Sequence, residues 1–250
     1  MEFDQYQDFA DRYDLFFDEA ARPESVRTEF FRTLFVQNKI QSILDCSCGT
    51  GRDLLMFHKL GLEVYGSDIS VSMLRQARRN LAGQAESIPL SAADFRVLPQ
   101  HFDRCFDAVV CLSSAILEMP DENNVLAALK SMQGVLNGGG LLVLTQGTAD
   151  KQWKQKPRFI PAVNTPEFSR VFVIDYFAGG ARYNILDIYH SDEARDFKVW
   201  SIEFAHIFLK DDFEKLLIMA GFNHLDFFGT FSFEPYSKDT SDHLIIVARK

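Results

Sequence analysis

Residues 43–53 read ILDCSCGTGRD, an apolar run that ends at Asp45 and is followed by two glycines, Gly49 and Gly51, within six positions. A glycine has no Cβ to keep the backbone away from a ligand, and it takes positive φ without steric cost. A glycine pair directly after a short strand and before a helix is typical of a βα turn that faces a ligand. The stretch therefore predicts an α/β sheet with a ligand at its first turn.

Apolar strands alternate with amphipathic helices from residue 40 to residue 147. Gly61 suits the end of the first helix, and Ser70 can cap the start of the second. Each strand is a nearly continuous apolar run, which is typical of parallel strands covered by helices on both faces. The predicted strands are 40–46, 62–68, one ending at 95, 105–112 and 138–146, and the predicted helices are 52–61, 70–82 and 121–136.

Both ends of the chain depart from this alternation. Aromatic residues recur at helical spacing before residue 40 and predict helices over 2–19 and 24–37. The basic stretch Lys151–Arg158 is interpreted as a solvated loop, and Gly179 with Gly180 predicts a hairpin between alternating strands. A helix over 209–222 and strands over 224–233 and 242–250 are predicted to complete the chain.

The predicted fold is α/β, with a Rossmann-like, seven-stranded, mostly parallel sheet and helices on both faces. An N-terminal helical cap and a small antiparallel insertion are added to this sheet. The predicted parts are the cap (1–39), the ligand-binding core (40–147), the insertion, which would cover the substrate (148–208), and the last helix and two strands of the core (209–250).

Composition limits the classes of partner. The chain has 250 residues and a formal charge of -9, which argues against a nucleic-acid surface. No apolar run approaches the roughly 20 residues of a membrane span, and the acidic start lacks the features of a secretory signal. The four cysteines have no zinc-like spacing and fit buried thiols in a reducing compartment. A cytoplasmic protein that binds a small molecule and no metal is expected, and the sequence makes no prediction of its oligomeric state.

Acidic residues at the ends of the next two strands indicate a nucleoside. Asp68 follows Gly51 by seventeen residues and is placed to accept hydrogen bonds from both ribose hydroxyls. Asp94 and Phe95 end the third strand at the same sheet edge and can contact adenine. Nicotinamide dinucleotide sites need a third glycine, but Leu54 occupies that position.

The order of these features resembles the class I S-adenosylmethionine-dependent methyltransferases, whose first turn reads D-x-G-x-G-x-G. The resemblance covers roughly residues 40–147 and 209–250, and one departure is Ser47 in place of the first glycine. Residues 43–70 are most similar to the glycine and sarcosine N-methyltransferases, whose motif also has a cysteine just before the paired glycines.

The resemblance implies a role for each candidate residue. The turn around Ser47, Gly49 and Gly51 would face the methionine part of S-adenosylmethionine, and Arg27 would bind its carboxylate. Leu112 would lie near the sulfonium. The alternative interpretations are core packing for Phe95 and Met73, a surface position for Arg27, and a charge at a helix start for Asp68. The residues expected to bind the cofactor are Arg27, Ser47, Gly49, Gly51, Asp68, Ile69, Met73, Asp94, Phe95 and Leu112.

Methyl transfer needs mainly alignment, because the sulfonium already makes the methyl group electrophilic. An amine acceptor must still be neutral, so a base can assist. The candidates are Tyr13, which the resemblance places over the active site, Glu118, interpreted rather as a solvated acid, and His190, interpreted as a sheet residue. The predicted function is methylation of a small molecule, with an amine favoured and Tyr13 as the catalytic residue. The alternatives are a nicotinamide-dependent oxidoreductase and a methyltransferase-like domain that binds without turnover.

Overall fold

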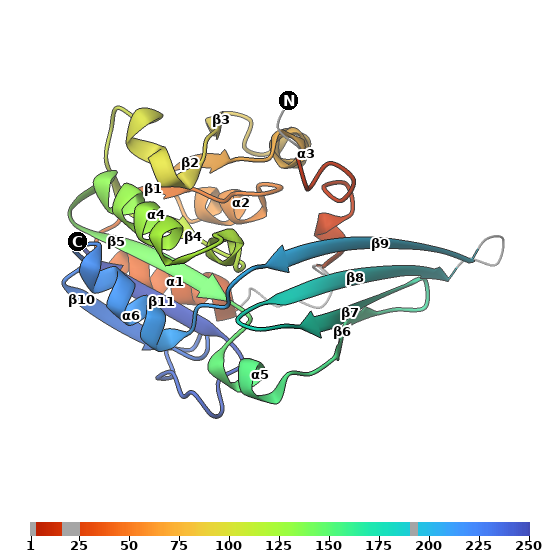
Figure 1. Cartoon of the computed structure of the whole chain (residues 1–250). Helices are drawn as coiled ribbons and strands as arrows, with labels where there is room; N and C mark the ends of the chain where they lie inside the picture. Colours follow the sequence, from red (N-terminus) through yellow and green to blue (C-terminus); the bar gives the residue numbers. More distant parts are fainter. Residues whose placement is uncertain (1–3, 17–25, 191–194) are drawn as a thin grey trace.

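The computed structural model of the chain describes residues 4–16, 26–190 and 195–250, and within them a seven-stranded sheet forms the centre. Its strand order is β10-β11-β5-β4-β1-β2-β3 (Figure 1). The neighbours from β5 to β3 are parallel, and β11 is antiparallel to both β5 and β10. The strands are β1 (Ser42–Asp45), β2 (Glu63–Asp68), β3 (Leu90–Ala92), β4 (Phe106–Cys111), β5 (Leu136–Gln146), β10 (His224–Phe228) and β11 (Leu244–Arg249).

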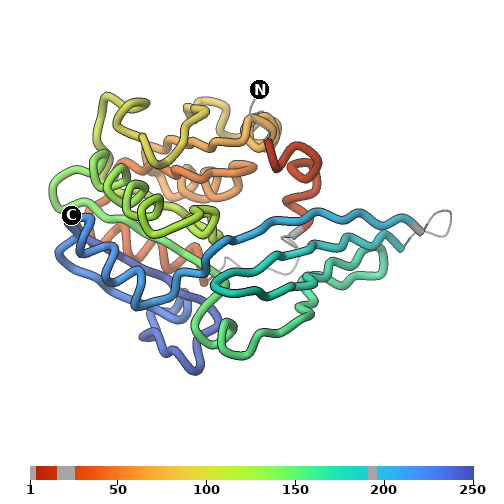
Figure 2. Tube along the Cα trace, in the orientation of Figure 1, coloured from red at the N-terminus to blue at the C-terminus, as the bar shows by residue number. Residues whose placement is uncertain are grey.

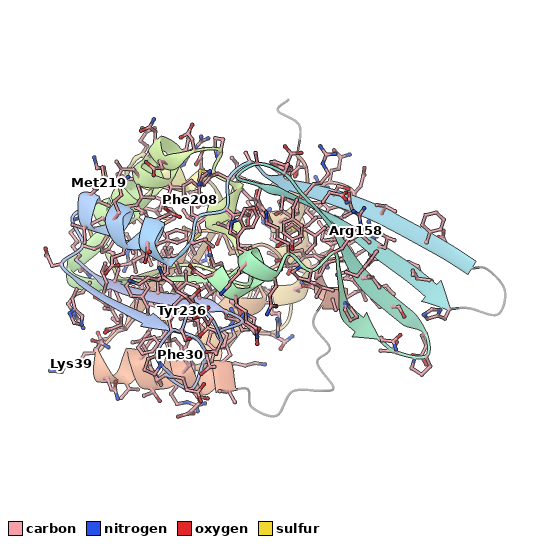
Figure 3. The ribbon with its side chains drawn as sticks, turned by 60° about the horizontal axis from the view of Figure 1, so that its bottom comes forward. Phe30, Lys39, Arg158, Phe208, Met219 and Tyr236 are labelled. Atoms are coloured by element: carbon pink, nitrogen blue, oxygen red, sulfur yellow. The ribbon has the colours of Figure 1, made fainter. Side chains whose placement is uncertain are left out.

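Helices cover both faces of this sheet, and each face has its own apolar cluster. Helices α1 (Val26–Gln37), α2 (Arg52–Lys59) and α3 (Val71–Leu81) share one cluster with alternate residues of the central strands. Helices α4 (Glu122–Gly134) and α6 (Lys210–Met219) belong to the other. Figure 3 shows Phe30, on α1, and Phe208, just before α6, on opposite sides of the sheet. The three-layer α/β prediction is confirmed.

Local signals explain why these helices begin where they do. The Ser70 hydroxyl accepts a hydrogen bond from the Met73 backbone N–H at the start of α3. The Asp121 carboxylate accepts one from the Asn124 backbone N–H at the start of α4. Both side chains satisfy an amide that the first helical turn leaves unpaired. The predicted helix starts near 70 and 121 are confirmed.

A second, four-stranded antiparallel sheet extends away from the main sheet (Figure 2). It contains β6 (Phe159–Asn164), β7 (Phe168–Tyr176), β8 (Ala181–His190) and β9 (Arg195–Phe204), in that order. The predicted hairpin is present, since Tyr176 pairs with Ala181 on either side of Gly179 and Gly180. The insertion is therefore a sheet whose inner face is available to line a site.

Three predictions need correction. Residues 5–12 form turns, followed by a short 3-10 helix, η1 (Tyr13–Phe16), instead of one helix over 2–19. Residues 2, 3 and 17–19 of that prediction lie outside the described residues. The stretch Lys151–Arg158 is not a loop throughout, because α5 (Asp150–Gln155) includes most of it. Cys105 is exposed, whereas the other three cysteines are buried thiols as expected.

Among the described helices, none combines the length and the apolar character that a bilayer crossing requires. The division into four parts at residues 39, 147 and 208 stays a prediction.

Candidate active site

A cavity of about 500 Å³ lies at the carboxyl ends of β1, β2 and β4, beside the glycine turn. We call it the turn cavity. Its position matches the crevice in which open α/β sheets bind their ligands. The predicted site residues that line it are Tyr13, Ser47, Gly49, Asp68, Ile69, Met73, Asp94, Phe95 and Leu112.

The two glycines of the turn have different roles. Both have left-handed backbone, with φ of 51° at Gly49 and 81° at Gly51. Gly49 lines the turn cavity. Gly51 does not, and a Cβ there would lie only 3.2 Å from the Cβ of Ala77 on α3. Gly51 therefore permits the turn and close helix packing, instead of facing the cavity.

The serine at position 47, where the family motif has its first glycine, makes hydrogen bonds within the turn. Its hydroxyl oxygen accepts a hydrogen bond from the Leu112 backbone N–H at 3.2 Å, and its own N–H donates to Asp45 at 3.1 Å. The side chain thus links the end of β1 to the end of β4. A glycine at this position could not make the first of these bonds.

Asp68 is the strongest candidate for binding the ribose. One carboxylate oxygen accepts the Gly49 N–H at 2.8 Å, and the other accepts the Ser70 N–H at 2.9 Å. Burial raises the pKa of Asp68 to about 6, although these backbone hydrogen bonds favour its charged form. A partly buried carboxylate with an unfavourable charge gains from further hydroxyl donors, and the residues present therefore fit a nucleoside.

Asp94 and Phe95 line the same cavity, but they follow β3 instead of ending it, because β3 stops at Ala92 and Asp94 caps a short 3-10 helix, η2 (Phe95–Gln100). Arg96 donates to both oxygens of Asp94, at 2.5 Å from Nη2 and 3.1 Å from Nε. Burial opposes ionisation of Asp94, but the bonds from Arg96 outweigh it and hold the pKa of Asp94 below its usual value. Asp94 is therefore ionised and fixed in place at neutral pH.

The remaining three residues contribute apolar walls. Met73 is buried, and its terminal methyl would lie 3.7 Å from a Cβ at Gly49. Ile69 is 59% exposed beside it, and Leu112 is almost fully buried at the end of β4. The cavity thus has an acidic side and an apolar side, as an adenosine would require.

A second and larger cavity, of about 930 Å³, adjoins the first between the main sheet edge and the insertion. We call it the insertion cavity. Tyr6, Tyr13, Arg52, Ser113 and Glu118 line both cavities. A group bound in one cavity can therefore meet a group bound in the other at this junction.

Glu118 is held firmly at the junction. Tyr6 donates its hydroxyl proton to Oε1 at 2.6 Å, and Gln5 donates to Oε2 at 2.6 Å. Burial raises the pKa of Glu118 to about 7, and the charge of Asp68 adds to the effect. The interpretation of Glu118 as a solvated acid is wrong, because residues from the start of the chain cover it.

Tyr13 is at the junction as predicted, but its chemistry is limited. Burial, and then the charges of Asp53 and Asp68, raise the pKa of Tyr13 far above its usual value. Its hydroxyl stays protonated at neutral pH, so Tyr13 is suited to hydrogen bonding and not to removing a proton. Its catalytic role stays a prediction.

Arg27 and His190 lie elsewhere. Arg27 lines the insertion cavity, and its guanidinium donates to Asp53 at 2.7 Å, while Asp53 lines the turn cavity. Arg27 is therefore connected to the turn cavity only through its ion pair with Asp53, and its contact with the cofactor carboxylate stays a prediction. His190 lines neither cavity, and its ring nitrogen is 2.8 Å from the Ser169 hydroxyl on the neighbouring strand. This position supports the sheet interpretation of His190.

The N-terminal segment (residues 4–16) contributes lining residues to both cavities and is bound on two sides. Asp4 accepts hydrogen bonds from Ser70 and Ser72 at the start of α3. On the insertion side, Arg12 donates to Asp187 at 2.5 Å, and both side chains are buried. Arg170 also donates to Asp187, so two guanidinium groups share one buried carboxylate.

Comparison with known proteins agrees with this geometry. Residues 43–140 match the family model of a methyltransferase domain. An S-adenosylmethionine-dependent methyltransferase from Clostridium acetobutylicum ATCC 824 has the same fold, with a TM-score of 0.81, 19% identity and coverage of 98% of both chains. The chain therefore contains a class I S-adenosylmethionine-dependent methyltransferase domain.

Within that class, it is a distant relative of the glycine/sarcosine N-methyltransferases. The enzyme of Parasynechococcus marenigrum (strain WH8102) is 33% identical over 155 residues, which span 60% of this chain and 55% of that protein. The enzyme of Aphanothece halophytica is 27% identical over 256 residues, covering 99% of this chain and 92% of that protein. These findings favour the methyltransferase prediction over the nicotinamide-dependent alternative.

Proposed function

We propose that this chain transfers the methyl group of S-adenosylmethionine to an amine nitrogen of a small molecule. The observation that supports it best is the junction, where a fixed carboxylate, Glu118, lines both cavities. An amine needs such a group, because only its neutral form has a free lone pair. The names of the two relatives, both N-methyltransferases, support the same choice of acceptor atom.

In this proposal the turn cavity holds the cofactor. Asp68 binds the ribose, Asp94 and Phe95 contact the adenine, and the turn from Ser47 to Gly49 lies along the methionine part. When bound, the cofactor would supply an electrophilic methyl group: the nitrogen lone pair would bond to the methyl carbon while the carbon–sulfur bond breaks, leaving its electron pair on the sulfur of S-adenosylhomocysteine. The cavity walls provide alignment, which can contribute on the order of 7–11 kcal/mol in favourable cases.

Glu118 acts on the acceptor side. Its pKa of about 7 lies close to neutral pH, where a general base works best. Its two hydrogen bonds, from Tyr6 and Gln5, use one lone pair on each oxygen and leave others for an ammonium group. The carboxylate takes the ammonium proton, and the neutral amine then faces the turn cavity.

Two measurements test the proposal. S-adenosylmethionine and S-adenosylhomocysteine should raise the melting temperature, since a ligand specific for the folded state stabilises it by mass action, and NAD should not. Mass spectrometry of a panel of amines, alcohols and thiols should then detect methylated product among the amines. Methylation confined to alcohols or thiols would disprove the nitrogen acceptor, and binding without turnover on any acceptor would favour the non-catalytic alternative.

A further inference from the structure

The inner face of the insertion carries apolar residues that lie opposite one another on all four strands. Ile160 pairs directly with Phe172, Phe172 with Ile185, and Ile185 with Trp200. These residues form one row across all four strands, and all four line the insertion cavity. We call them the apolar row. Residues directly opposite each other on neighbouring strands project from the same face, so the row is a continuous wall.

The row is held rigidly at the junction end. The Trp200 indole N–H donates to the Gln5 carbonyl at 2.8 Å, and the Phe9 ring stacks on Trp200 at a centroid distance of 4.3 Å. Gln5 is the residue that also bonds to Glu118. The apolar wall and the carboxylate are therefore fixed to each other through one short stretch of chain.

The last part of the core adds two more apolar residues, Phe231 and Ile245, to the lining of the insertion cavity, together with Asp242 and His243. At about 930 Å³ the cavity is at the upper end of the roughly 300–1,000 Å³ typical of sites for drug-sized ligands. A bound glycine or sarcosine would contact little of this wall.

Two of the cations that line the insertion cavity already pair with carboxylates of this chain. Among the lining residues, Arg27 pairs with Asp53 at 2.7 Å and Lys151 with Asp242 at 2.6 Å. Arg52, at the junction, also lines the cavity. Glu118 is the carboxylate at the junction and can pair with an ammonium group, while the apolar row suits an apolar group.

We propose that the acceptor is an amine attached to an aromatic or similarly bulky apolar group and without a carboxylate. Its ammonium group binds to Glu118, and its apolar body lies on the apolar row. This inference rests on the proposed function and narrows its acceptor to a class that differs from glycine and sarcosine.

Calorimetry on the full chain saturated with S-adenosylhomocysteine tests the acceptor class without turnover. The probes are 2-phenylethylamine, its carboxylated counterpart phenylalanine, its uncharged counterpart 2-phenylethanol, and glycine. We expect 2-phenylethylamine to bind at least tenfold more tightly than each of the other three. Equal or tighter binding of glycine or phenylalanine would overturn the inference.

Two variants of β7 distinguish the loss of a contact with the apolar row from a general effect on the strand. Phe172→Ala should weaken 2-phenylethylamine at least tenfold without changing the affinity for S-adenosylhomocysteine. Val173→Ala, the next residue on the same strand and outside both cavity linings, should change neither. Equal affinity of Phe172→Ala and wild type for the amine would contradict the placement of the apolar body.

Failure of this inference differs from failure of the proposed function. If glycine is methylated while 2-phenylethylamine neither binds nor reacts, the amine methyltransferase stands and only the acceptor class is wrong. If S-adenosylhomocysteine itself does not bind, or no amine is methylated, the proposed function fails first.

Discussion

Replacing Glu118 by glutamine should make the protein more stable at alkaline pH while reducing amine methylation. Glutamine has nearly the same shape and keeps an oxygen that can accept the Tyr6 hydroxyl, but it has no charge to bury. Burial raises the pKa of Glu118 from 4.5 to about 7, so the folded state disfavours the ionised carboxylate. Since one pKa unit corresponds to about 1.36 kcal/mol, the cost reaches up to about 3 kcal/mol once Glu118 is ionised.

The sign of the pH dependence follows from the protons bound. Between pH 4.5 and about 7 the folded protein keeps a proton on Glu118 that the unfolded chain has lost. The contribution of Glu118 to the free energy of unfolding therefore falls as pH rises through this window, and is constant above it. Glu118→Gln has no such proton, so its advantage over wild type should grow from near zero at pH 4.5 to up to about 3 kcal/mol at pH 8.

Urea denaturation of both proteins at pH 4.5, 6 and 8 measures this difference. Other titrating groups, including Asp68, are present in both proteins, so their contributions to the difference in unfolding free energy largely cancel. Methylation of the amine found in the panel should fall in Glu118→Gln, and its rate should lose the wild-type increase with pH near 7. A stability difference between Glu118→Gln and wild type that does not depend on pH would refute the conclusion that burial disfavours the ionised form of Glu118.

Three further predictions concern the cofactor site and the N-terminal segment. Asp68→Asn should weaken S-adenosylhomocysteine by about 1.5–3 kcal/mol. In wild type the affinity for S-adenosylhomocysteine should decrease as pH falls through about 6, because protonation removes the charged acceptor. If calorimetry shows that Asp68→Asn binds S-adenosylhomocysteine as tightly as wild type, the ribose contact is disproved. Arg27→Ala should weaken S-adenosylhomocysteine but not methylthioadenosine, which lacks the carboxylate, whereas equal losses would indicate damage to α1 and no loss would remove Arg27 from the site. Asp187→Asn should lower the free energy of unfolding by about 3–5 kcal/mol, because it leaves two buried guanidinium groups without their anion. Asp175→Asn, which removes the exposed ion pair with Arg158 and keeps one oxygen that can accept the Asn184 amide, should cost under about 1 kcal/mol by the same urea assay.

The sheet and its first turn could be predicted because their signals are local. Gly49 and Gly51 do adopt the left-handed backbone that the turn needs, and Asp68 and Asp94 both line the cavity beside it. Each of these features depends on the residues next to it and on the parallel order of the strands.

Glu118 and the start of the chain could not be predicted in the same way. The burial of Glu118 depends on Tyr6, which is 112 residues away in the sequence. The aromatic spacing before residue 17 resembles a helix, but Phe9 and Tyr6 pack on Trp200 of the insertion instead. Tertiary contacts of this kind override local periodicity, and one sequence contains no signal for them.

The position of the N-terminal segment predicts an energetic link between the two proposed ligands. The segment lines both cavities, and it bonds to α3 through Asp4 and to the insertion through Arg12. A ligand that orders the segment in one cavity lowers the entropic cost of ordering it for the other. Such coupling is reciprocal, so the acceptor should strengthen S-adenosylhomocysteine binding by the same factor by which the nucleoside strengthens acceptor binding.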